Sequence, residues 1–140
     1  MMHAGAGLLS SLLGIPWFLL YMVVGAALLA LFLMVYIRFT AHDEVGLIRE
    51  GNATAAIALG GTMLGFVIPL AKAIQQATSI PDMLVWGLAA FVVQLIAYAA
   101  ARLMVPDLSG KIGSNMIAAG IFLAAVSIAS GMLNAAAMSL

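Results

Sequence analysis

The sequence of 140 residues has no cysteine and few charged residues. The absence of thiols excludes disulfides, thiolate metal sites and cysteine-based catalysis. Only 7% of the residues are charged, whereas an ordinary soluble domain has about a quarter. Five basic residues balance five acidic ones, and no cluster of Lys and Arg is present. We therefore expect no nucleic-acid partner, because proteins bind nucleic acids through a basic surface.

The sequence also lacks the residue patterns of enzymes and coupled transporters. It has no Ser-His-Asp set, no HExxH motif and no phosphate-binding loop. No Asp, Glu, Lys, Arg or His falls near the centre of a long apolar run, although proton relays and secondary carriers usually need an ionisable group there. We therefore expect no catalytic residue, no cofactor and no metal site, and a coupled transporter is disfavoured.

Apolar residues are in excess and make up 66% of the chain. A fold of this length could not bury so much apolar surface in water, so the lipid bilayer is the expected solvent and partner. Four uncharged runs each have close to the ~20 residues that a helix needs to cross the hydrocarbon core. The predicted fold class is an all-α membrane protein with four transmembrane helices, at residues 17–37, 53–71, 83–101 and 116–138.

Charged residues mark the ends of the first and third runs in the same way. Asp43 follows Arg38 by five residues, and 64 residues further on Asp107 again follows Arg102 by five residues. This spacing predicts two tandem repeats, each an apolar span, a short charged loop and a second span. Because each repeat holds two spans, both repeats enter the membrane in the same sense and are parallel. The predicted division is an N-terminal segment, residues 1–16, and two repeats, residues 17–78 and 79–140.

The N-terminal segment is apolar but does not resemble a signal peptide. No Lys or Arg precedes its leucines, and no small-x-small cleavage site separates it from the first span. We expect a short helix that lies at the membrane interface and ends at Gly14 and Pro16.

The basic residues predict the orientation of the spans. Arg38, Arg49, Arg102 and Lys111 lie in the loops after the first and third spans, whereas Lys72 lies on the opposite side. Short loops that are richer in Lys and Arg stay in the cytoplasm. We therefore expect cytoplasmic charged loops and periplasmic termini.

The charged loops allow two interpretations. In the first, the arginines anchor the span ends to lipid phosphate and the aspartates cap helices. In the second, the two Arg–Asp pairs form a symmetric charged ring at a pore mouth or a docking surface. His42 could titrate near neutral pH, although a single loop histidine is more often only solvated. The candidate loop residues are Arg38, His42, Asp43, Glu44, Arg102 and Asp107.

The first loop has the clearer helical pattern. Thr40 and Asp43 fit a capping box at a helix start. Val45 and Ile48 then share one face, and Glu44 points elsewhere, which predicts a short helix at the cytoplasmic interface. In the second loop, two glycines make a regular helix less expected.

Five neutral polar residues could line a passage or join helices. Gln94 lies near the middle of the third span, where it either bonds across a dry helix contact or faces a solvated pore. Asn52 and Asn115 lie at the starts of the second and fourth spans, where they either cap these helices or line a vestibule. Thr62 and Asn134 complete the set of candidates within the spans.

Small residues predict where the helices pack. Gly61 and Gly65 are four residues apart in the second span, and Ser127 and Gly131 have the same spacing in the fourth. Such pairs let helix backbones approach closely in a membrane. We expect the second and fourth spans to form the core and the first and third to face lipid.

Several short motifs follow one another along the whole chain. They are Thr40-Ala41-His42-Asp43-Glu44, Asn52-Ala53-Thr54-Ala55-Ala56, Gly65-Phe66-Val67-Ile68-Pro69-Leu70, Ser79-Ile80-Pro81-Asp82 and Asn134-Ala135-Ala136. Their order resembles that of the YjfL-type bacterial inner-membrane proteins, the domain-of-unknown-function family 350 (UPF0719). The resemblance implies tandem two-helix units in a bacterial inner membrane. It brings no activity, ligand or catalytic residue.

Two functions remain open from the sequence. The first is a non-enzymatic helical bundle with a structural role, or one that docks a protein partner through its cytoplasmic loops. The second is a passive channel or permease for an ion or small polar solute. Four short helices enclose little space, so either function favours a homodimer or a larger homo-oligomer.

Overall fold

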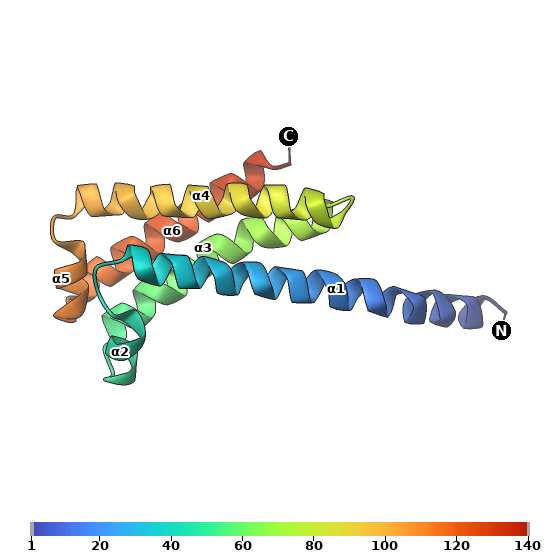
Figure 1. Ribbon diagram of the computed structural model, residues 1–140, viewed down its shortest axis with the longest axis horizontal. Helices are drawn as coiled ribbons and strands as arrows, with labels where there is room; N and C mark the ends of the chain where they lie inside the picture. The colour runs from blue at the N-terminus through green and yellow to red at the C-terminus, as the bar shows by residue number, and fades with distance from the viewer. Residues whose placement is uncertain (1, 140) are drawn as a thin grey trace.

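The structure, a computed structural model, describes residues 2–139 and the side chains from residue 4 onward (Figure 1). Within this range the chain forms α-helices and no strand. Four of the helices are long and apolar enough to cross a membrane, which confirms the predicted fold class. In chain order the helices are α1 (Met2–Phe39), α2 (Glu44–Arg49), α3 (Ala53–Gln76), α4 (Ile80–Met104), α5 (Leu108–Gly113) and α6 (Ile117–Ala137).

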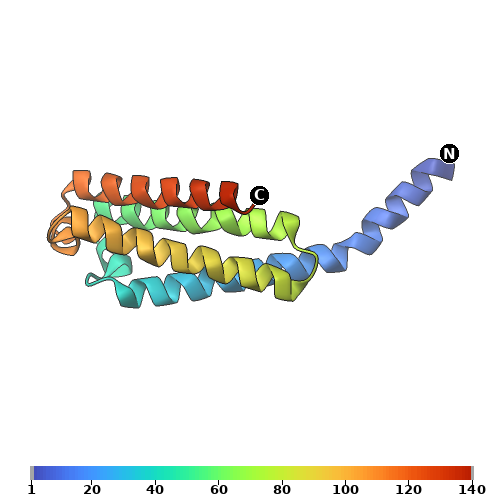
Figure 2. The same cartoon turned by 90° about the horizontal axis from the view of Figure 1, so that it is seen from above.

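The four long helices run along one direction, and the two short ones lie across one end of the bundle (Figure 1). We call this end, formed by residues 40–52 and 105–116, the loop end. Both termini lie away from it (Figures 1 and 2). Charged loops and termini are therefore separated along the bundle.

Helix α1 differs from the prediction at its N-terminal side. It continues through Gly14 and Pro16 as one helix of 38 residues, so the expected helix end at these residues is wrong. At 1.5 Å per residue it is about 57 Å long, well beyond the ~30 Å of a hydrocarbon core. Its blue N-terminal part bends away from the axis of the remainder (Figure 2), and an internal proline is one of the recognised causes of a bend. The interfacial location of this part stays a prediction.

The centre of the bundle is a direct contact between the backbones of α3 and α6. A Cβ atom added to Gly61 would lie 2.3 Å from the Cβ of Ala124, and one added to Gly131 would lie 2.1 Å from the carbonyl oxygen of Gly65. No side chain fits into either space. The structure thus places the small-residue pairs of both helices at one contact, where dispersion between closely packed backbones stabilises the pair.

Aromatic side chains attach α1 to this centre. Phe32 stacks on Phe66 of α3 with ring centroids 4.4 Å apart, and Phe91 of α4 meets Phe32 edge-on at 5.3 Å. Nearer the loop end, Tyr36 meets Tyr98 of α4 edge-on at 5.4 Å. Side chains therefore fill the distance between α1 and its neighbours, whereas α3 and α6 touch without them.

Candidate functional site

Gln94 reaches from α4 into the contact between α3 and α6. Its side chain is 1% exposed, and Nε2 donates to the carbonyl oxygens of Gly65 at 2.9 Å and Ser127 at 3.1 Å. The bond to Gly65 has a clear cause. In a helix this carbonyl would accept from the residue four positions later, which is Pro69 and has no N–H. Gln94 therefore supplies the donor that Pro69 lacks, as neighbouring helices do around prolines in membranes.

A second polar cluster lies toward the loop end from Gln94. The hydroxyl of Thr62 donates to the carbonyl of Ala58 at 2.9 Å and lies 3.2 Å from the hydroxyl of Tyr36 and 3.4 Å from that of Ser127. All three hydroxyl residues are buried. Asn134 is not part of this cluster, and its Nδ2 atom has no partner among the described residues. Thr62 and Gln94 thus join helices, and the structure does not place them on an open passage.

Asn52 connects the two halves of the chain at the loop end. Its Oδ1 accepts from the backbone N–H of Ala55 at 2.9 Å and so caps α3. Its Nδ2 donates to the carbonyls of Ile112 at 3.0 Å and Gly113 at 3.3 Å, in α5. One side chain therefore serves as the helix cap and as a link to the second loop.

Asn115 does not cap its own helix. The residue at the N-cap of α6 is Met116, which has no side-chain capping bond. The Oδ1 of Asn115 instead accepts from the backbone N–H of Thr54 at 3.2 Å and from its hydroxyl at 2.7 Å. The expectation that each asparagine caps the following span holds for Asn52 and is wrong for Asn115. Both asparagines act at the start of α3.

The backbones of the two loops correspond at a displacement of 64 residues. Gly51 and Asn115 both adopt a left-handed conformation, with φ of 87° and 60°. The next amide in each loop, that of Asn52 or Met116, donates to a carbonyl five residues earlier at 2.9 Å. Asn115 therefore corresponds to Gly51, one residue away from the pairing with Asn52 that the sequence indicated. Glycine and asparagine are the residues that tolerate this conformation best.

The arginines and aspartates of the loops do not pair. Arg38, Asp43, Arg102 and Asp107 are all exposed, and within residues 4–139 no ion pair joins them. Asp43 caps α2 by accepting from the N–H of Gly46 at 3.1 Å. Asp107 precedes α5 in a left-handed conformation and makes no capping bond.

The ionisable pair that does form at the loop end is His42 with Glu44. The Nε2 atom of His42 lies 3.4 Å from Oε1 of Glu44, and the two side chains are 7% and 1% exposed. Thr40 donates its hydroxyl to the same carboxylate oxygen rather than capping α2. The capping-box prediction is therefore wrong for Thr40, and the expectation of a solvated His42 is wrong as well.

Helix α2 turns an acidic residue, and not its apolar pair, toward the bundle. Val45 and Ile48, the expected apolar face, are 39% and 36% exposed, whereas Glu44 is buried. Burial raises the pKa of the Glu44 carboxyl, partly offset by the hydrogen bond from Thr40, and lowers the pKa of the His42 imidazole. A signal for this burial existed in the sequence: at the same position of the second loop stands Leu108, which is 1% exposed.

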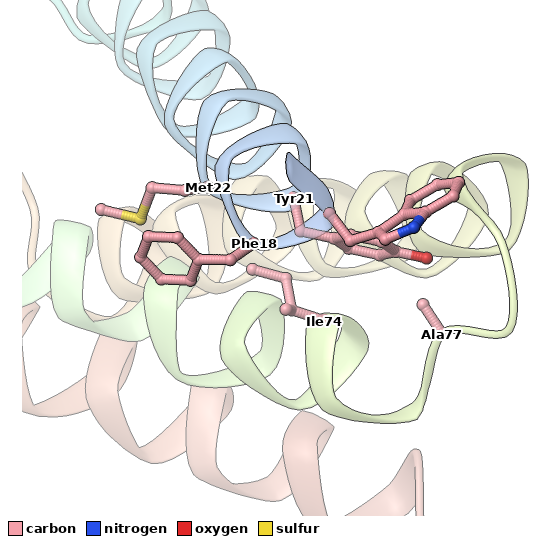
Figure 3. A pocket seen from close by; sticks show the side chains of 6 residues that line it. Phe18, Tyr21, Met22, Ile74 and Ala77 are labelled. Atoms are coloured by element: carbon pink, nitrogen blue, oxygen red, sulfur yellow. The ribbon is translucent and has the colours of Figure 1, made fainter. Parts of the chain in front are cut away.

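An apolar hollow of about 450 Å³ lies far from these residues, between α1 and the end of α3 (Figure 3). Phe18, Tyr21 and Met22 of α1 face Ile74 of α3 and Ala77, the residue that directly follows α3, across it. None of the polar candidates lines this hollow. Within the described residues no group of three or more His, Asp or Glu side chains could hold a metal ion.

Comparison of the sequence with known proteins identifies one family. The model of the family described as Domain of Unknown Function (DUF350) matches residues 8–138. The "UPF0719 inner membrane protein YjfL" of Escherichia coli K12 is 44% identical over 119 residues, which covers 85% of this chain and 90% of the relative. The "UPF0719 transmembrane protein YshE" of Bacillus subtilis is 37% identical over 78 residues, or 56% and 58% of the two chains. No solved structure matches the chain.

Proposed function

Because this chain belongs to the DUF350 family of membrane proteins, to which no activity is attached, we propose that it is a non-enzymatic helical bundle. In this proposal it forms a homo-oligomer and docks a protein partner at the loop end. The family name carries no enzymatic activity, and the described residues contain neither a catalytic set nor a metal cluster.

The observation that carries the proposal is the burial of Gln94. It lies near the middle of α4, and both N–H bonds of its amide are used by backbone carbonyls. A pore-lining amide would keep its N–H groups for water or solute. The Gln94 amide holds three helices together, so the centre of a single chain favours a structural bundle over a conduit.

The docking surface that we propose is the exposed side of α2. Val45 and Ile48 present apolar groups there, and Arg49 and Glu50 beside them are exposed. An apolar pair surrounded by charges is the usual composition of a small protein contact. The cross-repeat bonds of Asn52 and Asn115 hold this end of the bundle in place and support the use of its surface for binding.

The architecture and placement are part of the proposal. We assign residues 17–78 and 79–140 to two parallel repeats, supported by the equal backbone hydrogen bonds of the two loops, and residues 1–16 to an N-terminal segment. The membrane is the inner membrane, where the name of the Escherichia coli relative places that protein. The loop end faces the cytoplasm, since it carries most of the basic residues. An inactive periplasmic reporter fused after the last residue would contradict this orientation.

The experiment for docking is cross-linking in cells from a single cysteine. The natural chain has no cysteine, so Arg49→Cys on α2 gives one reactive site, and Lys111→Cys on α5 is its matched control. We expect a protein partner to be captured from α2 and not from α5. Recovery of this chain alone from both positions would contradict docking.

The experiment for a conduit is flux through purified protein in liposomes. We expect no passage of ions or small polar solutes above the level of protein-free liposomes. Flux that Gln94→Leu abolishes without disrupting the oligomer would replace the structural proposal by the channel.

A further inference from the structure

Glu44 occupies a position that the fold gives to an apolar residue elsewhere. It is the first residue of α2, directly after the N-cap Asp43. Leu108 is the first residue of α5, directly after the N-cap Asp107. Both side chains are 1% exposed, and the two loops share their backbone hydrogen bonds. Packing at this position is therefore satisfied by leucine, and a carboxyl group there has to be explained by its chemistry.

The surroundings of Glu44 leave it incompletely bonded. One carboxylate oxygen accepts from the hydroxyl of Thr40 and lies 3.4 Å from Nε2 of His42. The other oxygen, Oε2, has no hydrogen-bond partner among the described residues, and neither has either nitrogen of His42. A buried acid and a buried base thus adjoin each other, and the lysine and arginine side chains of the loop end do not neutralise them.

The charge of such a pair depends on how many protons it holds. With one proton the pair is neutral overall, whether the proton is on the carboxyl or on the imidazole. With no proton it is a buried anion, and with two it is a buried cation. Burying an uncompensated charge is costly, so the buried arrangement, here called the closed loop, is compatible with one proton.

We infer that Glu44 and His42 form a buried proton-binding site that holds one proton in the closed loop and releases α2 when this proton is lost or a second one is gained. The ligand is the proton itself. The inference rests on the proposed function only in its consequence, since opening the loop would change the docking surface that begins at the next residue, Val45.

The directions of the two pKa changes agree with this site. The pKa of Glu44 is raised by burial, so the closed loop loses stability as pH rises through that raised value. The pKa of His42 is lowered by burial, so the closed loop loses stability as pH falls through that lowered value. The loop is therefore most stable between the two.

Few other titratable groups face the pair. Asp43 precedes Glu44 on the loop and adds a like charge. Tyr36 of α1 interacts electrostatically with Glu44, and Tyr98 of α4 packs edge-on against Tyr36. Helix α3, which packs against α2, has no ionisable residue before Lys72. Glu50, the remaining carboxyl group of this loop, is exposed at the C-cap of α2.

Hydrogen exchange of the full chain in lipid nanodiscs, from about pH 4 to about pH 9, tests the site. The amides of α5 are an internal control, because its loop has Leu108 in place of the acid and they correct for the intrinsic pH dependence of exchange. We expect the protection of α2 relative to α5 to be greatest at intermediate pH. It should fall toward both extremes by up to about tenfold per pH unit, the limit for one proton.

Single variants separate the two limbs of this profile. Glu44→Gln keeps the size of the side chain and the acceptor for Thr40 but cannot ionise. It should therefore remove the loss of α2 protection at alkaline pH and keep the loss at acid pH. His42→Asn should remove the loss of α2 protection at acid pH and keep the loss at alkaline pH. Glu44→Leu, which places in α2 the residue found in the second loop, should also remove the loss of α2 protection at alkaline pH. Equal pH profiles of α2 and α5 in the natural chain would overturn the site, and so would a natural profile in Glu44→Gln.

A carboxyl titration gives a second measurement that does not depend on the stability of a variant. With ¹³C-labelled glutamate, the Glu44 signal should titrate above the ordinary range of a glutamate. Ordinary titration of Glu44 would overturn the site. If the protection of α2 depends on pH but cross-linking captures no partner, the docking proposal is contradicted and the proton-binding site is not.

Discussion

The contact between α3 and α6 and the attachment of α1 are built in opposite ways. Half of the α3 span is buried, against 17% of the α1 span. In the first contact glycines let two backbones touch and no side chain fits between them. In the second, aromatic rings fill the distance near the middle, and an apolar hollow is left beside Tyr21. The difference teaches that the bundle is specified at its centre by small residues and tolerates variation at α1.

The strongest test of this comparison uses two neighbouring glycines of α3. Gly61→Ala would place a Cβ 2.4 Å from the backbone Cα of Ala124, which cannot move aside, so we expect the free energy of unfolding to fall by about 3 kcal/mol. Gly60 meets nothing within 4 Å, so Gly60→Ala should raise stability by up to about 1 kcal/mol. Unfolding in mixed micelles with increasing SDS measures both. Equal effects would contradict the backbone contact.

The next test concerns the carbonyl of Gly65, which accepts a hydrogen bond from Gln94 because Pro69 has no N–H to donate. Gln94→Leu leaves the carbonyl of Gly65 without a donor, and we expect a loss of about 1–3 kcal/mol in the same unfolding measurement. Adding Pro69→Ala restores an N–H four residues after Gly65 and should recover about 1 kcal/mol of that loss.

The control for this pair is Pro69→Ala in the natural chain, where Gln94 already occupies the carbonyl and the gain should be smaller. If the two substitutions act additively, the account of Gln94 as a substitute donor is wrong.

A smaller effect is expected at the loop end of α3. Asn115→Ala removes the cap on Thr54 and forces alanine into a left-handed conformation, so stability should fall by about 2 kcal/mol. Asn115→Gly removes the cap alone and should cost about 1 kcal/mol. Thermal unfolding of the two variants side by side separates the contributions. An equal loss in both would show that the left-handed conformation contributes nothing.

The smallest effect is expected on α1. A Cβ added to Gly25 would lie 3.2 Å from the terminal Cδ1 of Ile74 and 3.7 Å from the Cε of Met83, both ends of flexible side chains. Gly25→Ala should therefore change stability by less than about 0.5 kcal/mol. A loss comparable to that of Gly61→Ala would remove the distinction between the two contacts.

Features that depend on one helix or on one residue type could be predicted from the sequence. The four spans followed from length and apolar composition, since a bilayer requires both. The face of Gly61 and Gly65 on α3 followed from a spacing that brings small residues to one side of a helix.

Features that depend on distant residues could not be predicted. The donor for the carbonyl of Gly65 comes from Gln94, 29 residues away on another helix, and no local pattern connects them. The cap on Thr54 comes from Asn115, 61 residues away. Helix α2 has only six residues, too few for hydrophobic periodicity to determine its buried face, and the sequence signal for a buried Glu44 lies 64 residues away, in Leu108 of the second loop.

The order in which the chain is made gives the proline in α3 a further consequence. When α3 has been synthesised and α4 has not, the carbonyl of Gly65 has no donor, because Pro69 has no N–H. The donor arrives with Gln94, and the glycine that covers the same carbonyl, Gly131, is synthesised later still. During biosynthesis the contact surface of α3 is therefore incomplete until α4 and then α6 have been made.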